Sequence, residues 1–258
     1  MRRLAIAAAV LAALAAALVL RPAFTAPIAS DDGIATLASE NLNGRAQWVL
    51  TRGLHRDRPV VLFLHGGPGM SAMYLAHAST RSLERDFVVV HWDRRDAGKS
   101  FDPAMNPDEE RVSVQLRDAE ELIGRLRERF GGRRVLLVGH SWGTQLGVLL
   151  AQRHPDWLAA YVGVGQIADP ALARAVADRF LLAEAVQELA APVFVAAGRH
   201  DYNTPSELAA AWLERLDAPC KELFWFERSA HFPFLEEPER FAEVMRQILA
   251  TPCVAERL

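Results

Sequence analysis

The sequence predicts an α/β fold in which helices cover both faces of a mostly parallel sheet of eight strands. Short apolar runs alternate with longer helical patterns along the chain, which is typical of parallel strands joined by right-handed crossovers. The runs are rich in β-branched and aromatic residues and are bounded by glycine or proline, as buried strands require. A chain of 258 residues with 51% apolar content is long enough to bury a core of this kind.

A β-hairpin is expected first, around Asn43-Gly44, because both residues accept the positive φ angles of a tight turn. Its second strand should run from Ala46 to Arg52. Six further strands are predicted from apolar runs at Val60–His65, Phe87–Trp92, Val135–Gly139, Tyr161–Gly165, Val193–Gly198 and Leu223–Phe226. The clearest helix runs from about Val114 to Phe130, with an apolar stripe facing charged residues and Gly131-Gly132 as its stop.

The pentapeptide Gly139-His140-Ser141-Trp142-Gly143 lies between a predicted strand and a predicted helix. A Gly-x-Ser-x-Gly sequence in that setting is typical of a nucleophile elbow, a strained turn that exposes a serine hydroxyl. The pentapeptide alone is also compatible with an ordinary glycine-rich turn. Its position between strand and helix favours Ser141 as a nucleophile.

A serine hydroxyl needs a base to take its proton and an acid to orient that base. Asp201 follows the strand ending at Gly198, and His231 follows the strand ending at Phe226, so both lie where ligands bind in open α/β sheets. The order Ser141, Asp201, His231 is the one used by enzymes with a nucleophile elbow. A turn-opening role for Asp201 and a purely structural loop role for His231 are the alternatives, and His200 is a weaker rival base because it adjoins Asp201.

His65-Gly66-Gly67-Pro68-Gly69 follows the strand that begins at Val60. In this position a glycine-rich loop supplies backbone N–H groups to an oxyanion hole, so we expect the amides of Gly67 and Trp142 to be the two donors. Gly66 and Pro68 are expected to line the substrate. A tight Gly-Pro turn that binds no ligand is the alternative.

These motifs resemble those of the proline iminopeptidase-like α/β-hydrolases. The resemblance rests on the glycine-rich loop, the elbow with tryptophan after the serine, Trp92-Asp93-Arg94-Arg95-Asp96-Ala97-Gly98-Lys99-Ser100, Gly198-Arg199-His200-Asp201 and Ser229-Ala230-His231-Phe232-Pro233. It spans about Ala46 to Leu249. It implies an α/β-hydrolase fold, a triad of Ser141, Asp201 and His231, and attack on an ester or amide carbonyl through an acyl-enzyme.

Aminopeptidases of that family carry a helical cap whose acidic residues hold the free amine of the peptide. Here the corresponding interval, residues 166–191, is too short for a cap of several helices. We therefore expect hydrolysis of a small carboxylic ester, amide or short peptide. A proline iminopeptidase-like activity that uses Glu184 or Glu188 as a reduced amine clamp is the runner-up, and a non-catalytic membrane-anchored binding module is a third possibility.

The first 29 residues are expected to direct export, ahead of a hydrolase domain at 30–258. Arg2 and Arg3 precede an uncharged apolar run, residues 4–20, which could anchor the chain in a membrane or serve as a cleaved signal peptide. A signal-peptide cleavage site should have small residues at positions -3 and -1, but cleavage after Ala26 would put Phe24 at -3, and cleavage after Ala29 would put Pro27 there. The prediction leans to an uncleaved anchor, with the domain facing the periplasm or the cell exterior.

Composition limits the partners. The net charge of -3 and scattered basic residues argue against nucleic acid, and no spacing of His, Cys, Asp or Glu suggests a metal, so no cofactor is predicted. Cys220 and Cys253 could form a disulfide in an exported domain, although spacing alone does not establish one. The sequence does not determine the oligomeric state.

Overall fold

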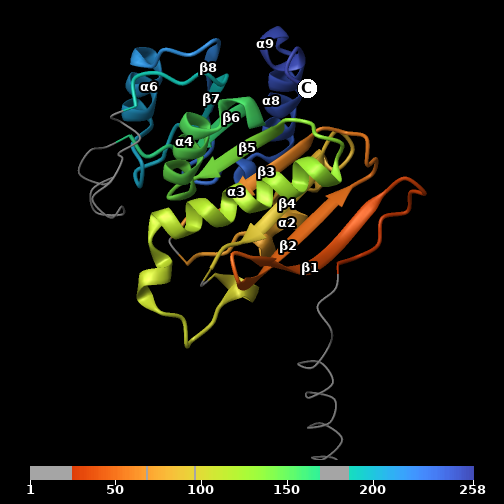
Figure 1. Ribbon diagram of the computed structural model, residues 1–258. Helices are drawn as coiled ribbons and strands as arrows, with labels where there is room; N and C mark the ends of the chain where they lie inside the picture. The colour runs from red at the N-terminus through yellow and green to blue at the C-terminus, as the bar shows by residue number, and fades with distance from the viewer. Residues whose placement is uncertain (1–24, 68, 96, 169–185) are drawn as a thin grey trace, which may run out of the picture.

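The computed structural model describes residues 25–67, 69–95, 97–168 and 186–258. The predicted anchor at residues 4–20, Pro68, and residues 169–185 of the predicted cap lie outside this described part of the chain. Glu184 is among them. Figure 1 shows the arrangement of the remaining elements.

The predicted hairpin is confirmed. Strand β1 (Ile34–Leu42) pairs antiparallel with β2 (Arg45–Gly53), and only Asn43 and Gly44 separate them. Both turn residues have positive φ, 47° and 82°, as a two-residue hairpin turn requires.

The sheet has eight strands within the described residues, in the order β1-β2-β4-β3-β5-β6-β7-β8. Pairs involving β1 and β2 are antiparallel, and every other pair is parallel. The parallel strands are β3 (Val60–Leu64), β4 (Val88–Asp93), β5 (Val135–His140), β6 (Leu158–Val164), β7 (Val193–Gly198) and β8 (Lys221–Phe226). This is the α/β-hydrolase fold that the sequence predicted.

Helices cover both faces of the sheet because side chains alternate in direction along each strand. In β3, Val60, Leu62 and Leu64 pack on the side of α3, α4 and α6, whereas Val61 and Phe63 pack on the side of α7, α8 and α9. The bounds of these helices are α3 (Val112–Arg129), α4 (Gly143–Arg153), α6 (Ser206–Arg215), α7 (Pro233–Glu236), α8 (Pro238–Ala250) and α9 (Pro252–Ala255). A short α2 (Ala76–Ser79) contacts α7.

The strand β6 begins three residues earlier than predicted, at Leu158 instead of Tyr161. Leu158, Ala159 and Ala160 are fully buried between the two helical layers, so tertiary burial outweighs the low strand propensity of alanine. At its other end the strand stops at Val164, because Gly165 has a positive φ of 53°.

Cys220 and Cys253 form a disulfide that ties the start of β8 to α9. The sequence had left this pairing open. In the part of the chain that the structure describes, no helix has the length and apolar content needed to cross a membrane.

Candidate active site

Ser141 lies at the sharp turn between β5 and α4, at the carboxyl edge of the sheet. Its φ is 51°, a strained value for a residue other than glycine, and its backbone N–H donates to the carbonyl of Val164 in the neighbouring strand (2.9 Å). A Cβ at Gly143 would lie 2.2 Å from the carbonyl oxygen of Leu64, so only glycine fits there. Local packing thus enforces the geometry that the pentapeptide predicted.

Asp201 and His231 come together beyond the ends of β7 and β8. His231 Nδ1 lies 2.8 Å from Asp201 Oδ2, and the Asp201 side chain is only 1% exposed. The other carboxylate oxygen accepts the backbone N–H groups of Asn203 and Thr204, both at 2.9 Å, while Thr204 Oγ1 donates to Oδ2 at 2.7 Å. Burial acts to raise the pKa of Asp201, but these hydrogen bonds outweigh it and the pKa is lowered.

His231 is held beside the turn that carries Ser141. His140 Nε2 donates to the backbone carbonyl of His231 (2.9 Å), and a Cβ at Gly165 would lie 2.9 Å from His231 Cε1. Gly165 directly follows Val164, which accepts the N–H of Ser141. Within the described residues the Ser141 hydroxyl makes no hydrogen bond to the His231 imidazole, so the structure forms the Asp–His half of the predicted triad.

The predicted oxyanion loop lies against the serine. A Cβ at Gly66 would be 3.0 Å from Ser141 Cβ, and Gly67 has a φ of 116° that side chains rarely allow. The N–H of Gly67 donates to no other described residue. Trp142, the other predicted donor, directly follows Ser141 and is buried.

Arg94 is a buried residue of this site that the sequence did not single out. It follows β4, is 1% exposed, and donates through Nη2 to the carbonyls of His65 (2.7 Å) and Gly66 (3.0 Å). Its guanidinium also lies 4.3 Å from the centre of the Trp142 ring. Burial lowers the pKa of Arg94 to about 9, which leaves the group charged at neutral pH.

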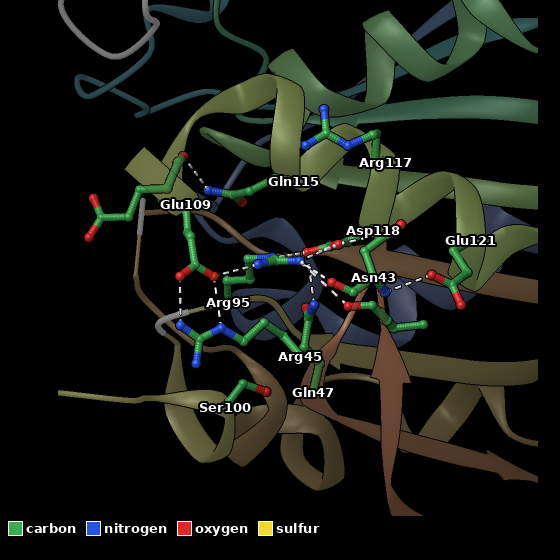
Figure 2. A network of polar contacts seen from close by, with 12 residues as sticks. Asn43, Arg45, Gln47, Arg95, Ser100, Glu109, Gln115, Arg117, Asp118 and Glu121 are labelled. Atoms are coloured by element: carbon green, nitrogen blue, oxygen red, sulfur yellow. Dashed lines mark hydrogen bonds and ion pairs between the residues drawn. The ribbon is translucent and has the colours of Figure 1, made fainter. Parts of the chain in front are cut away.

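The next residue, Arg95, forms ion pairs with carboxylates, whereas Arg94 donates to backbone carbonyls. It pairs with the buried carboxylate of Asp118 on α3 and, at 2.7 Å, with Glu109, which in turn binds Arg45 of β2 at 2.6 Å (Figure 2). This network joins the loop after β4 to the hairpin and to α3. It therefore fixes the backbone from which Arg94 reaches the oxyanion loop.

Two other acidic or basic candidates do not reach this site. Glu188 forms a backbone bridge with Asp217, upstream of β7 and β8, and so lies at the edge of the sheet opposite Asp201. His200 has an exposed side chain, and its backbone N–H donates to the carbonyl of Ser229. Among the described residues, no group of three or more His, Cys, Asp or Glu side chains is placed to hold a metal ion.

Thr204 is a second member of the site that sequence reasoning missed. It caps the Asp201 carboxylate, and Thr204 Oγ1 is 3.4 Å from His231 Nδ1. Its signal in the sequence was its place three residues after Asp201, where turn residues bond back to an aspartate. Arg94 belongs to a motif that carries the family resemblance, but the sequence did not indicate its partners, which are the His65 ring and two backbone carbonyls.

Comparison with known proteins agrees with this fold. A family model described as the alpha/beta hydrolase fold matches residues 59–182. The protein of Bacillus subtilis named "Probable aminopeptidase" is 22% identical over 303 aligned positions, which cover 82% of this chain and 95% of that relative. Because 303 positions exceed the 258 residues of this chain, the relative has insertions that this chain lacks.

A proline iminopeptidase of Lactobacillus helveticus is 24% identical over 159 residues, covering 61% of this chain. The chain spans about half, 52%, of that relative. Among solved structures, the proline iminopeptidase of Mycobacterium smegmatis has a TM-score of 0.67 at 19% identity, covering 86% of this chain and all of that one. An esterase of Exiguobacterium antarcticum has the same TM-score at 18% identity, with 84% and 100% covered. These structural likenesses establish the fold.

Proposed function

We infer that this chain, which has the α/β-hydrolase fold and distant proline iminopeptidase relatives, is a serine hydrolase that cleaves carboxylic esters or amides. The observation that carries this inference is the 2.8 Å contact between Asp201 and His231 beside the strained turn of Ser141. A buried carboxylate aimed at an imidazole, next to an elbow serine, is the arrangement that serine hydrolases use.

The proposed reaction follows from which nitrogen of His231 is occupied. Because Nδ1 faces Asp201, Nε2 is the nitrogen that accepts the Ser141 proton as the hydroxyl oxygen attacks the substrate carbonyl. The tetrahedral intermediate collapses to an acyl-enzyme, and His231 passes its proton to the departing alcohol or amine. Water then attacks the acyl-enzyme with His231 as base, which releases the acid and frees Ser141.

The proposal requires the Ser141 hydroxyl to reach His231 when substrate binds. Catalytic hydrogen bonds are often long or absent before substrate arrives and shorten in the complex. The His140 bond to the His231 carbonyl and the Val164 bond to the Ser141 amide hold both backbones, so the proposal assigns the approach of the hydroxyl to the serine side chain.

Fluorophosphonate labelling tests the class of enzyme. An activated Ser141 should be labelled in the full-length protein, whereas Ser141→Ala should not. Ser100, a buried serine that donates to the Asp93 carbonyl, supplies a control, because Ser100→Ala should leave labelling intact. Folded protein that is not labelled would contradict the proposal and favour a non-catalytic, membrane-anchored binding module.

The preferred substrate is a small ester or amide. The relatives named as aminopeptidases favour an aminopeptidase as the second candidate. Two observations weigh against it: Glu188 lies at the opposite edge of the sheet, and the Bacillus relative has insertions that this chain lacks. Glu184, the other proposed amine clamp, lies outside the described residues.

A substrate pair decides between these candidates. We expect p-nitrophenyl butyrate to be turned over faster than proline p-nitroanilide. Faster turnover of the anilide, lost when its amine is acetylated, would reverse that order. The rate of Ser141→Ala on each substrate measures the background hydrolysis and is subtracted from the wild-type rate.

We also propose that residues 1–29 place the domain outside the cytoplasm, held by the apolar run at residues 4–20. The charge order of that segment and the Cys220–Cys253 disulfide support this placement, since disulfides persist in oxidising compartments. Protease treatment of intact spheroplasts should digest the domain. Protection of the domain until the cells are lysed would contradict the proposal.

A further inference from the structure

We infer that Arg94 is a positioning residue that holds and polarises the oxyanion hole. This inference rests on the proposed serine hydrolase activity. It concerns how the chain orients the Gly67 N–H, and it assigns a role to a buried arginine that neither the family resemblance nor the triad explains.

The argument begins with the contacts of one nitrogen. Arg94 Nη2 donates to the carbonyl oxygens of both His65 and Gly66, at 2.7 and 3.0 Å. The carbonyl of Gly66 and the N–H of Gly67 belong to the same planar peptide unit and point in opposite directions. A donor on that carbonyl therefore fixes the direction of the Gly67 N–H and polarises it towards the substrate oxygen.

His65 supplies a second donor to the same carbonyl. Its Nδ1 lies 2.9 Å from the oxygen of Gly66, so the proton is on Nδ1, and Nε2 accepts the backbone N–H of Arg94 at 3.2 Å. Burial and then the charge of Arg94 hold the pKa of His65 well below its ordinary value, so the ring is neutral. The peptide between Gly66 and Gly67 is thus clamped by two side chains.

The same guanidinium touches the other proposed donor. Arg94 Cζ lies 4.3 Å from the centre of the Trp142 ring, and the Trp142 amide is the N–H that follows the nucleophile. One side chain therefore supports both halves of the oxyanion hole.

The charge of Arg94 is uncompensated, unlike that of its neighbour. Arg95 pairs with Asp118 and Glu109, whereas no carboxylate among the described residues pairs with Arg94, and its buried Nη1 has no hydrogen-bond partner there. Burying an unpaired cation destabilises a fold. Such a cation beside the oxyanion hole favours the negative charge that develops on the substrate oxygen in the transition state.

Arg94→Met removes the charge and both donors at similar length. We expect kcat to fall about 10- to 100-fold, below the roughly 10²–10³ that loss of a whole donor causes. KM should stay within about threefold, because the interaction strengthens only in the transition state. Inhibition by a trifluoromethyl ketone, which forms a tetrahedral oxyanion on Ser141, should weaken by the same factor as kcat/KM.

Two further variants separate positioning from structure. Arg94→Lys keeps the charge without the forked donor, and it should recover part of the lost kcat. Arg257 also donates to two backbone carbonyls, those of Pro155 and Leu158 at the opposite end of the sheet, so Arg257→Met is a matched control that should leave kcat unchanged.

The outcomes distinguish this inference from the one it rests on. If the wild type is not labelled by fluorophosphonate, the proposed function fails. If the wild type is labelled and Arg94→Met keeps the wild-type kcat and inhibitor affinity, only the role of Arg94 is overturned. Should Arg94→Met not fold, Arg94→Lys decides in its place: wild-type kcat and inhibitor affinity would overturn the role, and a parallel loss of both would support it.

Discussion

The Nε2 atom of His140 donates a hydrogen bond to the backbone carbonyl of His231, at 2.9 Å. His140 directly precedes Ser141, so this bond joins the turn of the proposed nucleophile to the loop of the proposed base. The two rings lie 4.9 Å apart, and Phe232 and Phe234 pack on His140. His140 therefore sets the distance between two loops that are 90 residues apart in the chain.

His140→Leu should break this connection. We expect it to lower the free energy of unfolding by about 1–3 kcal/mol, because the His231 carbonyl loses its partner. A fall in kcat should accompany it. His140→Gln retains an N–H donor and should keep more of the activity, and kinetics with p-nitrophenyl butyrate would measure the difference. Wild-type kcat in His140→Leu would contradict the connection.

Asp201→Asn should lower kcat by about 10⁴-fold, because an amide neither orients the correct tautomer of His231 nor stabilises its cation. The control is Asp217→Asn, an exposed carboxylate at the opposite edge of the sheet that should leave kcat unchanged. Circular dichroism would verify that both variants fold. An active Asp201→Asn enzyme would remove Asp201 from the proposed triad.

Acid should destabilise the protein through its buried histidines. Burial, with the neighbouring charges of His77 and His231 respectively, lowers the pKa of His91 and His140 to about 3 from 6.5. Below pH 6.5 these two histidines bind protons in the unfolded chain but stay neutral in the folded protein. Their contribution to the free energy of unfolding is therefore complete above pH 6.5 and is lost as the pH falls towards 3. Each site contributes about 1.4 kcal/mol per pH unit in that window.

His91→Gln isolates one of these contributions. His91 Nε2 lies 2.8 Å from Thr80 Oγ1, and glutamine retains a donor for it without titrating. Urea unfolding between pH 6 and 4 should show a slope smaller by about 1.4 kcal/mol per pH unit than the wild type. An unchanged slope would mean that His91 takes up its proton in the folded state.

Removal of the disulfide should lower the free energy of unfolding by about 3–4 kcal/mol. Cys220 and Cys253 close a loop with a sequence separation of 33. A cross-link over a loop of this length lowers the conformational entropy of the unfolded chain, which corresponds to about 3–4 kcal/mol of stability. In urea unfolding, the double variant Cys220→Ser with Cys253→Ser should have the same midpoint as the wild type measured in the presence of reductant. If reductant leaves the wild-type midpoint unchanged, the bond does not contribute.

Two glycines should respond to alanine in opposite ways. Gly143→Ala places a Cβ against the carbonyl of Leu64 and should destabilise the fold by more than about 3 kcal/mol. Gly124 lies within α3 with open space around it, so Gly124→Ala should stabilise by about 0.5–1 kcal/mol. Thermal unfolding of the pair tests the elbow packing directly.

The sequence by itself determined the local structure of this protein. Asn43-Gly44 predicted the hairpin turn because the turn needs a positive φ at two successive residues, and few residue types other than asparagine and glycine tolerate one. The alternation of apolar runs and helical patterns predicted the α/β fold, and the elbow glycines predicted a strained turn at Ser141, because such features depend on residues close together in the chain.

Only the tertiary structure decided which distant groups meet. The pairing of Cys220 with Cys253, the position of Glu188 at the edge opposite Asp201, and the contacts of Arg94 with the Gly66 carbonyl all depend on how strands and loops pack. A backbone carbonyl leaves no mark in the sequence, so the partners of Arg94 could not be read from it. The physical reason is that burial and hydrogen bonding across the sheet are properties of the packed chain, whereas turn and strand preferences belong to single residues and their neighbours.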